Sequence, residues 1–316
     1  MSELPLVSIV TPSLNQGKFI EATIRSVLSQ NYPNIEYIVM DGGSEDETLT
    51  ILRSFGDRIR WVSEPDSGQA QAVNKGWRLA RGEILGWLNA DDLLARGAVR
   101  RAVSVLQAAP ELAGVYGDCA YINEDGQPVG KFPSRPYDYN QLVQFCEDFI
   151  PQPGTFLRRA QVEQLGMLDE DLHYVMDYDL WLRLGMYARL EYLPEEAAQA
   201  RLHIGAKTVS SASNFGHELV SVFLRLVQHP DFPSPLLQQK DMILANAFIH
   251  AASLCFWGGE MRMVRDYLYR AWRHNPLPKG CTFWRLLAFS LAGRVGWRLA
   301  ERLHGNPFRL EHGMLR

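Results

Sequence analysis

The first third of the chain alternates between short apolar runs and amphipathic stretches. The apolar runs predict buried strands over 6–11, 35–40, 58–63 and 83–88, and a fifth strand that ends near residue 118. Apolar residues at helical spacing predict helices over 17–30, 49–55, 72–80 and 95–108. This alternation with short connections is typical of an α/β fold: a mostly parallel, Rossmann-like sheet flanked by helices.

Local signals mark several boundaries of these elements. Pro12 predicts the end of the first strand, because proline cannot donate to a sheet ladder. Ser44 and Glu47 have the spacing of a capping box at the start of the helix over 49–55. Residues 123–126 (NEDG) predict a hairpin turn.

The second half of the chain changes character. A Pro-rich and aromatic stretch at 133–153 predicts a loop with a short helix, followed by a strand at 154–157. A helix over 175–187 and a strand over 189–193 come next, and the pattern is helical from residue 214 onward. We therefore expect an α/β domain over 1–212 and an α-helical C-terminal extension over 213–316.

Acidic residues follow strand after strand. They are Asp41, Asp66, Asp91 with Asp92, and Asp118. Parallel strands share one carboxyl edge, where ligands bind in open α/β sheets, so these acids are expected along one rim. The adjacent carboxylates of Asp91 and Asp92 suit Mg²⁺ or Mn²⁺, which prefer oxygen ligands. The alternative is a helix N-terminus, where acidic residues are favoured by the dipole.

The charge is unevenly distributed. The 316 residues carry a net charge of −4, which argues against nucleic acid as the main partner. Residues 261–316 hold 11 Lys and Arg against 3 Asp and Glu, a net charge of +8, so the remainder carries −12. A basic C-terminal region on an acidic body favours an anionic surface or partner.

The cysteines and the hydropathy of the chain indicate the cellular compartment in which the protein is expected. The four cysteines show no CxxC spacing and are expected to be reduced, mostly buried thiols of a cytoplasmic protein. The N-terminal stretch, with Glu3 and a short apolar run, does not have the pattern of a signal peptide. No uncharged apolar run of 18 residues predicts a membrane span.

Several common catalytic motifs are missing from the sequence. There is no GxGxxG, no HExxH and no serine elbow, and residues 15–18 (NQGK) do not form a P-loop. Hydride transfer, P-loop phosphoryl transfer, zinc peptidase and serine hydrolase chemistry therefore have no support.

Five short motifs together resemble the family 2 glycosyltransferases of the GT-A fold. In chain order they are residues 11–15 (TPSLN), 41–44 (DGGS), 68–76 (GQAQAVNKG), 88–92 (LNADD) and 176–183 (MDYDLWLR). The resemblance covers about residues 5 to 210. It implies transfer of a sugar from a nucleotide-sugar, usually with inversion and with a divalent metal, Mn²⁺ or Mg²⁺. The metal fits this chemistry, because the leaving nucleoside diphosphate develops negative charge.

The resemblance also implies a donor site. Its nucleotide-binding residues would be Thr11, Pro12, Asn15, Asp41, Gln69, Asn74, Lys75 and Asn89. Asp41 would accept a hydrogen bond from the base, with capping of its own turn as the alternative. Lys75 would lie near phosphate, with a solvated helix face as the alternative.

The metal motif departs from the family's D-x-D form, because Asn89 stands at its first acidic position. Asp91 fills the position that usually contacts metal, and Asp92 follows it. His203 corresponds to a histidine that approaches the metal or diphosphate in family members, and imidazole suits Mn²⁺ better than Mg²⁺. An isolated histidine also has many structural explanations.

Two acids compete for the role of catalytic base. Asp179 has Arg183 four residues later, the spacing of a helical ion pair, so we expect Asp179 to be structural. Asp177 has no such partner in the sequence, and the family's base matches Asp177 as well. A helix N-terminal acid is the alternative reading of Asp177. Gln152 and Thr155 are assigned to the acceptor side by resemblance.

The C-terminal region carries an apolar stripe with arginines beside it. Phe283, Trp284, Leu287 and Leu291 belong to this stripe, which favours an interfacial helix on the cytoplasmic face of a membrane. The alternatives are packing on the catalytic domain and a homodimer interface. Residues 251–276 also resemble one tetratricopeptide-type hairpin, although an ordinary helix pair is favoured, because one copy cannot form a solenoid.

The sequence thus predicts an inverting, metal-dependent glycosyltransferase of cell-surface polysaccharide synthesis. The favoured donor is a UDP-sugar, and the acceptor is a saccharide or a lipid-linked molecule. One rival is a non-catalytic nucleotide-sugar-binding or scaffold protein on the same fold. A second rival is a sugar nucleotidyltransferase, but that chemistry needs a Gly- and Arg-rich loop after the first strand, which residues 12–18 lack.

Overall fold

The structure is a computed structural model that describes residues 4–203, 211–276, 281–304, 310–311 and 314–315. The chain divides into two compact units. The first comprises Met1–Tyr137 with Phe149–Arg201, and the second comprises Asp138–Asp148 with Leu202–Arg316. The division falls after Arg201, whereas the expected boundary is at residue 212. The insertion at 138–148 could not be foreseen, because it joins the helical unit from far away in the sequence.

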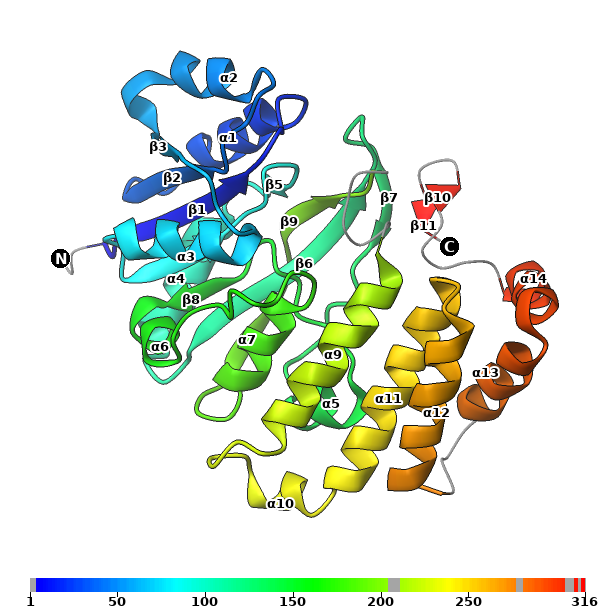
Figure 1. Ribbon diagram of the computed structural model, residues 1–316. Helices are drawn as coiled ribbons and strands as arrows, with labels where there is room; N and C mark the ends of the chain where they lie inside the picture. The colour runs from blue at the N-terminus through cyan, green and yellow to red at the C-terminus, as the bar shows by residue number, and fades with distance from the viewer. Residues whose placement is uncertain (1–3, 204–210, 277–280, 305–309, 312–313, 316) are drawn as a thin grey trace. The chain divides into compact units, whose positions relative to one another are not determined.

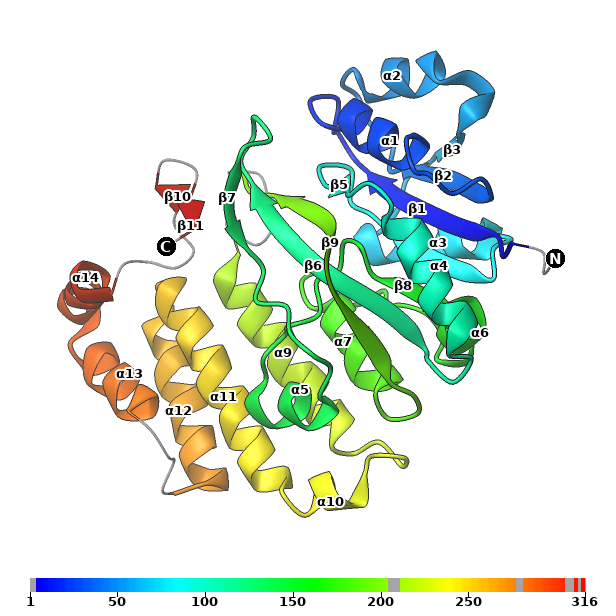
Figure 2. The same ribbon diagram turned by 180° about the vertical axis from the view of Figure 1, so that it is seen from behind.

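The first unit is an α/β unit built on one mixed sheet (Figures 1 and 2). Its elements are β1 (Val7–Ser13), α1 (Ile20–Leu28), β2 (Ile35–Asp41), α2 (Thr48–Ser54), η1 (Gly56–Arg58), β3 (Arg60–Ser63), α3 (Gln69–Leu79), β4 (Ile84–Trp87), β5 (Leu93–Leu94), α4 (Ala98–Ala108), β6 (Gly114–Ile122), β7 (Pro128–Lys131), β8 (Phe156–Arg158), α6 (Arg159–Gln164), α7 (Met176–Leu184) and β9 (Leu190–Arg201). The predicted α/β architecture is confirmed.

The sheet has a parallel half and a mixed half. Its strand order is β3-β2-β1-β4-β8-β6-β9-β5, with β7 paired to β6. The ladders between β3, β2, β1 and β4 are all parallel, as the alternating sequence pattern predicts. Beyond β4 the sheet turns mixed, because β8 runs antiparallel to both β4 and β6 while β9 runs parallel to β6.

Helices cover both faces of the parallel half, so β1 is buried along its whole length (Figures 1 and 2). Val7 and Ile9 belong to the apolar core that also contains residues of α1 and α4. Val10 points to the opposite face, where α3 packs. The approach there is close, since a Cβ at Gly76 of α3 would lie 2.4 Å from Val10 Cγ1. The glycine thus permits helix and strand to touch.

Two predicted boundaries are wrong. Pro12 does not end β1, which continues to Ser13 and pairs with β2 throughout. The proline is tolerated because β4 pairs with β1 only as far as Val10, so one side of the strand has no ladder partner there. The capping box is also wrong. Glu47 stands at the N-cap of α2 without a side-chain cap, and Ser44 bonds to Asp41 instead.

The prediction that Asp118 lies on the carboxyl rim is wrong as well. It lies inside β6, which runs on to Ile122, and its carboxylate accepts a hydrogen bond from the Tyr192 hydroxyl at 2.5 Å. The sequence pattern stopped this strand too early, because the run that follows the acid alternates less clearly. The predicted turn at 123–126 is confirmed between β6 and β7, where Asn123 and Gly126 close it.

The second unit is helical. Its elements are α5 (Tyr139–Phe145), α9 (Ala212–Leu226), α10 (Ser234–Leu237), α11 (Lys240–Trp257), α12 (Met261–His274), α13 (Thr282–Leu291), α14 (Gly293–His304) and a short ladder of β10 (Leu310–Glu311) with β11 (Met314–Leu315). α5 is tied to α11 by a hydrogen bond of 2.7 Å from Asn246 Nδ2 to the Gln144 carbonyl. Among the described residues, no helix is long and apolar enough to cross a membrane.

Candidate active site

The loop that carries Asp91 and Asp92 follows β4 directly and is held by α1. Thr23, a fully buried residue of α1, donates its hydroxyl to the carbonyls of Ala90 and Asp92, each at 2.8 Å. The Asp92 N–H closes the turn on the Asn89 carbonyl at 3.2 Å. The backbone at the end of the strand is therefore held by hydrogen bonds at Ala90 and Asp92.

Asp92 is a buried carboxyl, 4% exposed. Its Oδ1 accepts the backbone N–H of Arg201 at 2.9 Å, and the side chain of Asn89 also bonds to it. Burial raises the pKa of Asp92 well above its usual range, and the adjacent charge of Asp91 adds to the shift. A pair of like charges in this setting is the arrangement that a bound cation relieves.

Arg201, the last residue of β9, links this turn to the turn between β6 and β7 with its guanidinium. Its Nε donates to the Asp91 carbonyl at 2.9 Å, and its Nη1 donates to the carbonyls of Asn123 and Glu124, each at 2.9 Å. The guanidinium also lies 5.0 Å from the centroid of the Phe19 ring. Burial lowers the pKa of Arg201, although the nearby carboxylates oppose that shift. Arg201 thus supplies fixed positive charge beside the acid pair.

Asn89 links α3 to the acid pair. Its Oδ1 accepts from Gln69 Nε2 at 2.7 Å and from the indole N–H of Trp87 at 2.9 Å. A neutral amide can bond both to these donors and, through its own N–H, to Asp92. The departure from the D-x-D pattern therefore has a local physical reason: an amide at this position binds two donors and one acceptor.

The ends of β1 and β2 form one hydrogen-bonded corner. Asp41 is 1% exposed, and its Oδ2 accepts from the N–H groups of Gly43 and Ser44 and from the Ser63 hydroxyl. Asn15 has a left-handed φ of 53° and donates its N–H to the Ser44 hydroxyl at 2.7 Å. The turn-capping role given as the alternative for Asp41 is thus present. Contact with a nucleotide base stays a prediction.

Thr11 and Pro12 are buried just before this corner. The hydroxyls of Thr11 and Tyr37 lie 3.0 Å apart, and burial raises the pKa of Tyr37 far above its usual range. Thr11 and Pro12 are among the last residues of β1. The structure places them at the end of β1, as the motif predicts, and their contact with a nucleotide stays a prediction.

Asn74 and Lys75 are both occupied by protein groups. Asn74, 1% exposed, donates to the Leu168 carbonyl and to Glu170 and accepts the Leu168 N–H. Lys75 Nζ lies 2.8 Å from Glu64 Oε1 and donates to the Pro65 carbonyl at 3.0 Å. Asn74 therefore fixes the loop before α7, and Lys75 binds the residues that follow β3.

That loop is fixed to α3 by one acid. Glu170 accepts from Asn74 at 3.0 Å and from Gln71 at 3.1 Å, and it pairs with Arg78 at 3.2 Å. The Asn74 hydrogen bond is the main reason why the pKa of Glu170 lies below its usual value. Farther along the loop, His173 approaches Gly68, whose absent Cβ would lie 3.1 Å from His173 Nδ1. α7 consequently begins next to the start of α3.

The two acids of α7 have different surroundings. Asp179 is buried and forms an ion pair of 2.7 Å with Arg183, which also donates to the Leu165 and Met167 carbonyls. The expected pair at four-residue spacing is therefore confirmed, and Asp179 is structural. Asp177, half-buried in the first turn of the same helix, has one oxygen 2.9 Å from the Tyr178 N–H. Its role as a base stays a prediction.

Gln152 and Thr155, assigned to the acceptor, are buried at the edge of β4. Gln152 Nε2 donates to the Trp87 carbonyl at 2.5 Å, and the Thr155 hydroxyl donates to the Pro151 carbonyl at 2.6 Å. His203 belongs to the second unit, whereas Asp91 and Asp92 belong to the first. The acceptor and metal roles of these three residues stay predictions.

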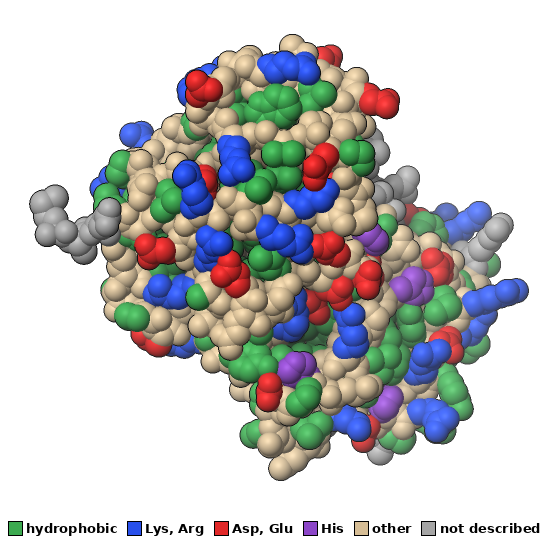
Figure 3. Space-filling model, turned by 60° about the vertical axis from the view of Figure 1, so that its left-hand side comes forward, with side chains coloured by type: hydrophobic (Ala, Val, Ile, Leu, Met, Phe, Trp, Pro, Cys, Tyr) green, Lys and Arg blue, Asp and Glu red, His purple; other side chains and the backbone are tan. Residues whose placement is uncertain are grey.

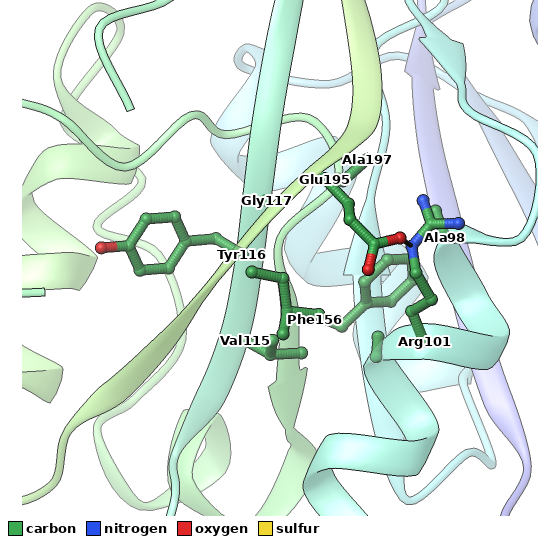
Figure 4. A pocket seen from close by; sticks show the side chains of 11 residues that line it. Ala98, Arg101, Val115, Tyr116, Gly117, Phe156, Glu195 and Ala197 are labelled. Carbon is green, nitrogen blue, oxygen red and sulfur yellow. Dashed lines mark ion pairs between the residues drawn. The ribbon is translucent and has the colours of Figure 1, made fainter. Parts of the chain in front are cut away.

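A small pocket in the first unit is distinct from this cluster of acids. It lies between α4 and the strands β6 and β9 and is lined by Tyr116, Phe156 and Ala197 among others (Figure 4). Arg101 and Glu195 form an ion pair of 3.0 Å there. None of the predicted site residues lines the pocket, so we place the candidate site at the strand ends and not here.

Sequence reasoning missed Arg201, Thr23 and Glu170. Arg201 lies 109 positions after Asp92, and no spacing rule connects the two. Thr23 is one polar residue on an apolar helix face, which is a usable signal, because a buried hydroxyl needs a partner. Glu170 lies in the acidic run of 169–171, which has the appearance of a solvated loop.

Comparison with solved structures shows the fold. S. aureus TarS, residues 1–349, in complex with UDP-GlcNAc, matches with a TM-score of 0.70 at 16% identity, over 97% of this chain and 94% of that chain. A mannosyltransferase from Pyrobaculum calidifontis in complex with GDP-Man and Mn²⁺ matches with a TM-score of 0.63 at 20% identity, over 97% and 85%. The fold is the GT-A fold.

The chain belongs to glycosyl transferase family 2, whose family model matches residues 8–166. An uncharacterized glycosyltransferase of Rickettsia typhi is 30% identical over 66% of this chain and 68% of its own length. The chondroitin synthase of Escherichia coli is 29% identical over 64% of this chain, but the match spans only 30% of that enzyme. The protein is a glycosyltransferase.

Proposed function

We propose that this glycosyltransferase moves a sugar from a UDP-sugar to a hydroxyl of a saccharide or lipid-linked acceptor, with inversion, in cell-surface polysaccharide synthesis. The observation that carries the proposal is the acid pair after β4, in which Asp92 is buried and Asp91 is half-buried. It is fixed by Thr23, Asn89 and Arg201 at the carboxyl edge of the parallel strands. The UDP-GlcNAc complex of TarS and the named synthase relatives support a nucleotide-sugar donor and a saccharide product.

The donor site follows from the strand ends. Asn15 and Asp41 would face the nucleoside, with Thr11 and Pro12 beneath it. Gln69 would face the sugar or diphosphate from the start of α3, and Asn74 and Lys75 would act as positioning residues for the neighbouring loops. The choice between UDP, dTDP and GDP depends on a few hydrogen bonds at this corner.

The residues present fit a hard divalent cation. Asp91 and Asp92 would hold Mn²⁺ or Mg²⁺, since the paired carboxylates raise each other's energy and offer oxygen ligands. Asn89 and His203 are further candidates, through a bound water and an imidazole nitrogen respectively. A cation held there supplies charge stabilisation to the leaving diphosphate.

The transfer step needs one base. Asp177 would accept the proton of the acceptor hydroxyl while the hydroxyl oxygen bonds to the anomeric carbon. The bond to the nucleoside diphosphate breaks on the opposite face, so the configuration inverts. Gln152 and Thr155 would support the acceptor side by fixing the backbone at residues 87 and 151.

Calorimetric titration of UDP, dTDP and GDP, in Mn²⁺ and in EDTA, tests the donor site. We expect metal-dependent binding of one nucleotide, loss of that binding in Asp91→Ala, and normal binding in Asp57→Ala, which removes an exposed acid of η1. Absence of binding to any of the three under both conditions would overturn the proposed donor and metal.

We further propose that α13 and α14 bring the enzyme to an anionic membrane surface. Trp284, Leu291, Val295, Leu299 and Leu303 are between 48% and 74% exposed on these helices. Arg285, Arg298 and Arg302 are exposed on the same two helices. By contrast, basic and acidic side chains are interspersed on the face drawn in Figure 3. Basic, aromatic and aliphatic residues together favour an interfacial helix.

Co-sedimentation with vesicles distinguishes membrane binding by α13 and α14 from the alternative roles of these helices. We expect binding to phosphatidylglycerol vesicles at low salt, weak binding to phosphatidylcholine vesicles, and loss of binding when Leu291, Val295 and Leu299 are changed to serine. If the wild-type protein ignores both vesicles and the triple variant converts a dimer to a monomer, α13 and α14 form a homodimer interface instead.

A further inference from the structure

A second cluster of ligand-type side chains lies in the helical unit, separate from the acid pair. His217 of α9, Cys255 of α11 and Glu260 at the N-cap of α12 each present one ligand atom, and the three atoms lie within 4.8 Å of one another. In Figures 1 and 2, α11 lies between α9 and α12. The three residues therefore join three helices at one point.

The fold fixes this convergence. Gly216, beside His217, lets α9 approach α11, because a Cβ there would lie 3.0 Å from the Ala251 carbonyl. Gly259 takes a left-handed φ of 85°, and the turn it makes returns the Glu260 N–H to the Cys255 carbonyl at 2.9 Å. Cys255 and Glu260 thus face the same point from the two sides of a tight turn.

A hydrogen bond to Tyr267 orients the His217 ring. His217 Nδ1 lies 2.6 Å from the hydroxyl of Tyr267, a buried residue of α12, and His217 Nε2 lies 3.3 Å from Glu260 Oε2. A hydroxyl that accepts Nδ1–H would leave the lone pair of Nε2 pointing at the cluster. This is the usual arrangement of a metal-ligating histidine, whose second nitrogen bonds to a supporting group.

We propose that His217, Cys255 and Glu260 bind a borderline transition metal of the Zn²⁺ type that clamps α9, α11 and the start of α12 together. Imidazole, thiolate and carboxylate are the three ligand classes that zinc accepts. Three protein ligands leave one position for water. The mixed nitrogen and sulfur donors separate this site from the all-oxygen acid pair, which suits Mg²⁺ or Mn²⁺.

Binding must displace a proton from the thiol. Burial raises the pKa of Cys255 to about 12, so the metal-free sulfur is protonated at neutral pH. The metal forms a bond to sulfur as the S–H proton leaves to the buffer, and affinity therefore rises with pH. In the metal-free state, His217 has the other tautomer. Its Nε2–H donates to Glu260, and its Nδ1 accepts the O–H of Tyr267, so both ring nitrogens have partners.

Cobalt titration of the chelator-treated full chain tests the site directly, because Co²⁺ replaces Zn²⁺ and a cobalt–thiolate bond gives a charge-transfer band in the near ultraviolet. We expect one equivalent of Co²⁺ to produce this band and Zn²⁺ to abolish it. The band should disappear in Cys255→Ser and persist in Cys281→Ser, which removes the exposed cysteine of the same unit. It should also persist in Asp91→Ala, which separates this site from the donor site.

Two conservative variants guard against a folding failure in Cys255→Ser. Glu260→Gln and Tyr267→Phe should keep the band but weaken cobalt affinity about 10–100-fold, as expected when a ligand or its supporting hydrogen bond is impaired. The proposal is overturned if no thiolate band forms, if the band survives in Cys255→Ser, or if both conservative variants bind cobalt as tightly as the wild type.

Discussion

Arg201 donates its backbone N–H to Asp92 Oδ1 at 2.9 Å, and its guanidinium binds the Asp91 carbonyl and, in the turn between β6 and β7, the carbonyls of Asn123 and Glu124. The last residue of β9 thus fixes a carboxylate that follows β4. A buried positive charge beside two carboxylates compensates part of their repulsion in the absence of a cation.

Removal of that charge should destabilise the fold. We expect Arg201→Met to lower the free energy of unfolding by about 3 kcal/mol, because it leaves buried carboxylate charge uncompensated. Arg201→Lys should recover only part of this, since an ammonium cannot donate to three carbonyls in fork geometry. Urea denaturation monitored by circular dichroism measures the difference. An unchanged midpoint in Arg201→Met would show that the guanidinium is not needed.

Asn89→Asp should make the protein depend on metal for stability. The aspartate can still accept from Gln69 and Trp87, but it loses the amide donor to Asp92 and adds a third negative charge. We expect the metal-free variant to be less stable by about 1–2 kcal/mol. Mn²⁺ should raise its melting temperature more than that of the wild type, as thermal scans with Mn²⁺ and EDTA will measure. Asn89→Ser, which adds no charge, is the control.

Asp177 and Asp179 offer a matched pair on one helix. Asp177→Asn should lower kcat about 10²–10⁴-fold with little change in stability, because it removes the proposed base. Asp179→Asn should instead cost about 1–3 kcal/mol of stability, because it weakens the buried bond to Arg183. Single-turnover transfer assays and denaturation curves on both variants distinguish the roles. Equal loss of activity and stability in the two would contradict the assignment.

Glu170 should contribute to the loss of folding stability at acidic pH. Its folded pKa lies below the usual value of 4.5, first because Asn74 donates to it. Its contribution is therefore fully present above pH 4.5 and is lost as pH falls below that value through the folded pKa. We expect Glu170→Gln to cost about 1 kcal/mol at pH 7 and to flatten the loss of stability below pH 4.5.

Unfolding measured from pH 3 to pH 7 checks this expectation. Glu163→Gln, which alters a more exposed acid that pairs with Arg159, provides the control. If the free energy of unfolding falls more steeply with decreasing pH in Glu170→Gln than in the wild type, the lowered pKa of Glu170 is contradicted.

The sequence determined the parallel half of the sheet, the order of the motifs and the helical C-terminal part. Short apolar runs and helical periodicity report local burial, and Asp179 with Arg183 shows that a four-residue spacing can predict a specific pair. The same local signals failed at Pro12 and Ser44. The presence or absence of a neighbouring strand decides whether a proline is tolerated, and the preference of Ser44 for Asp41 depends on the corner that β1 and β2 build together.

Only the tertiary structure decided which distant residues support the site. The bonds of Arg201 to the turn at Asp91, of Asn74 to Glu170, and of Gln152 to the Trp87 carbonyl each span dozens of residues. The convergence of His217, Cys255 and Glu260 likewise depends on how three helices pack. Spacing along the chain records which residues share a helix face or a strand edge. It does not record which elements become neighbours, because packing of the whole fold sets that choice.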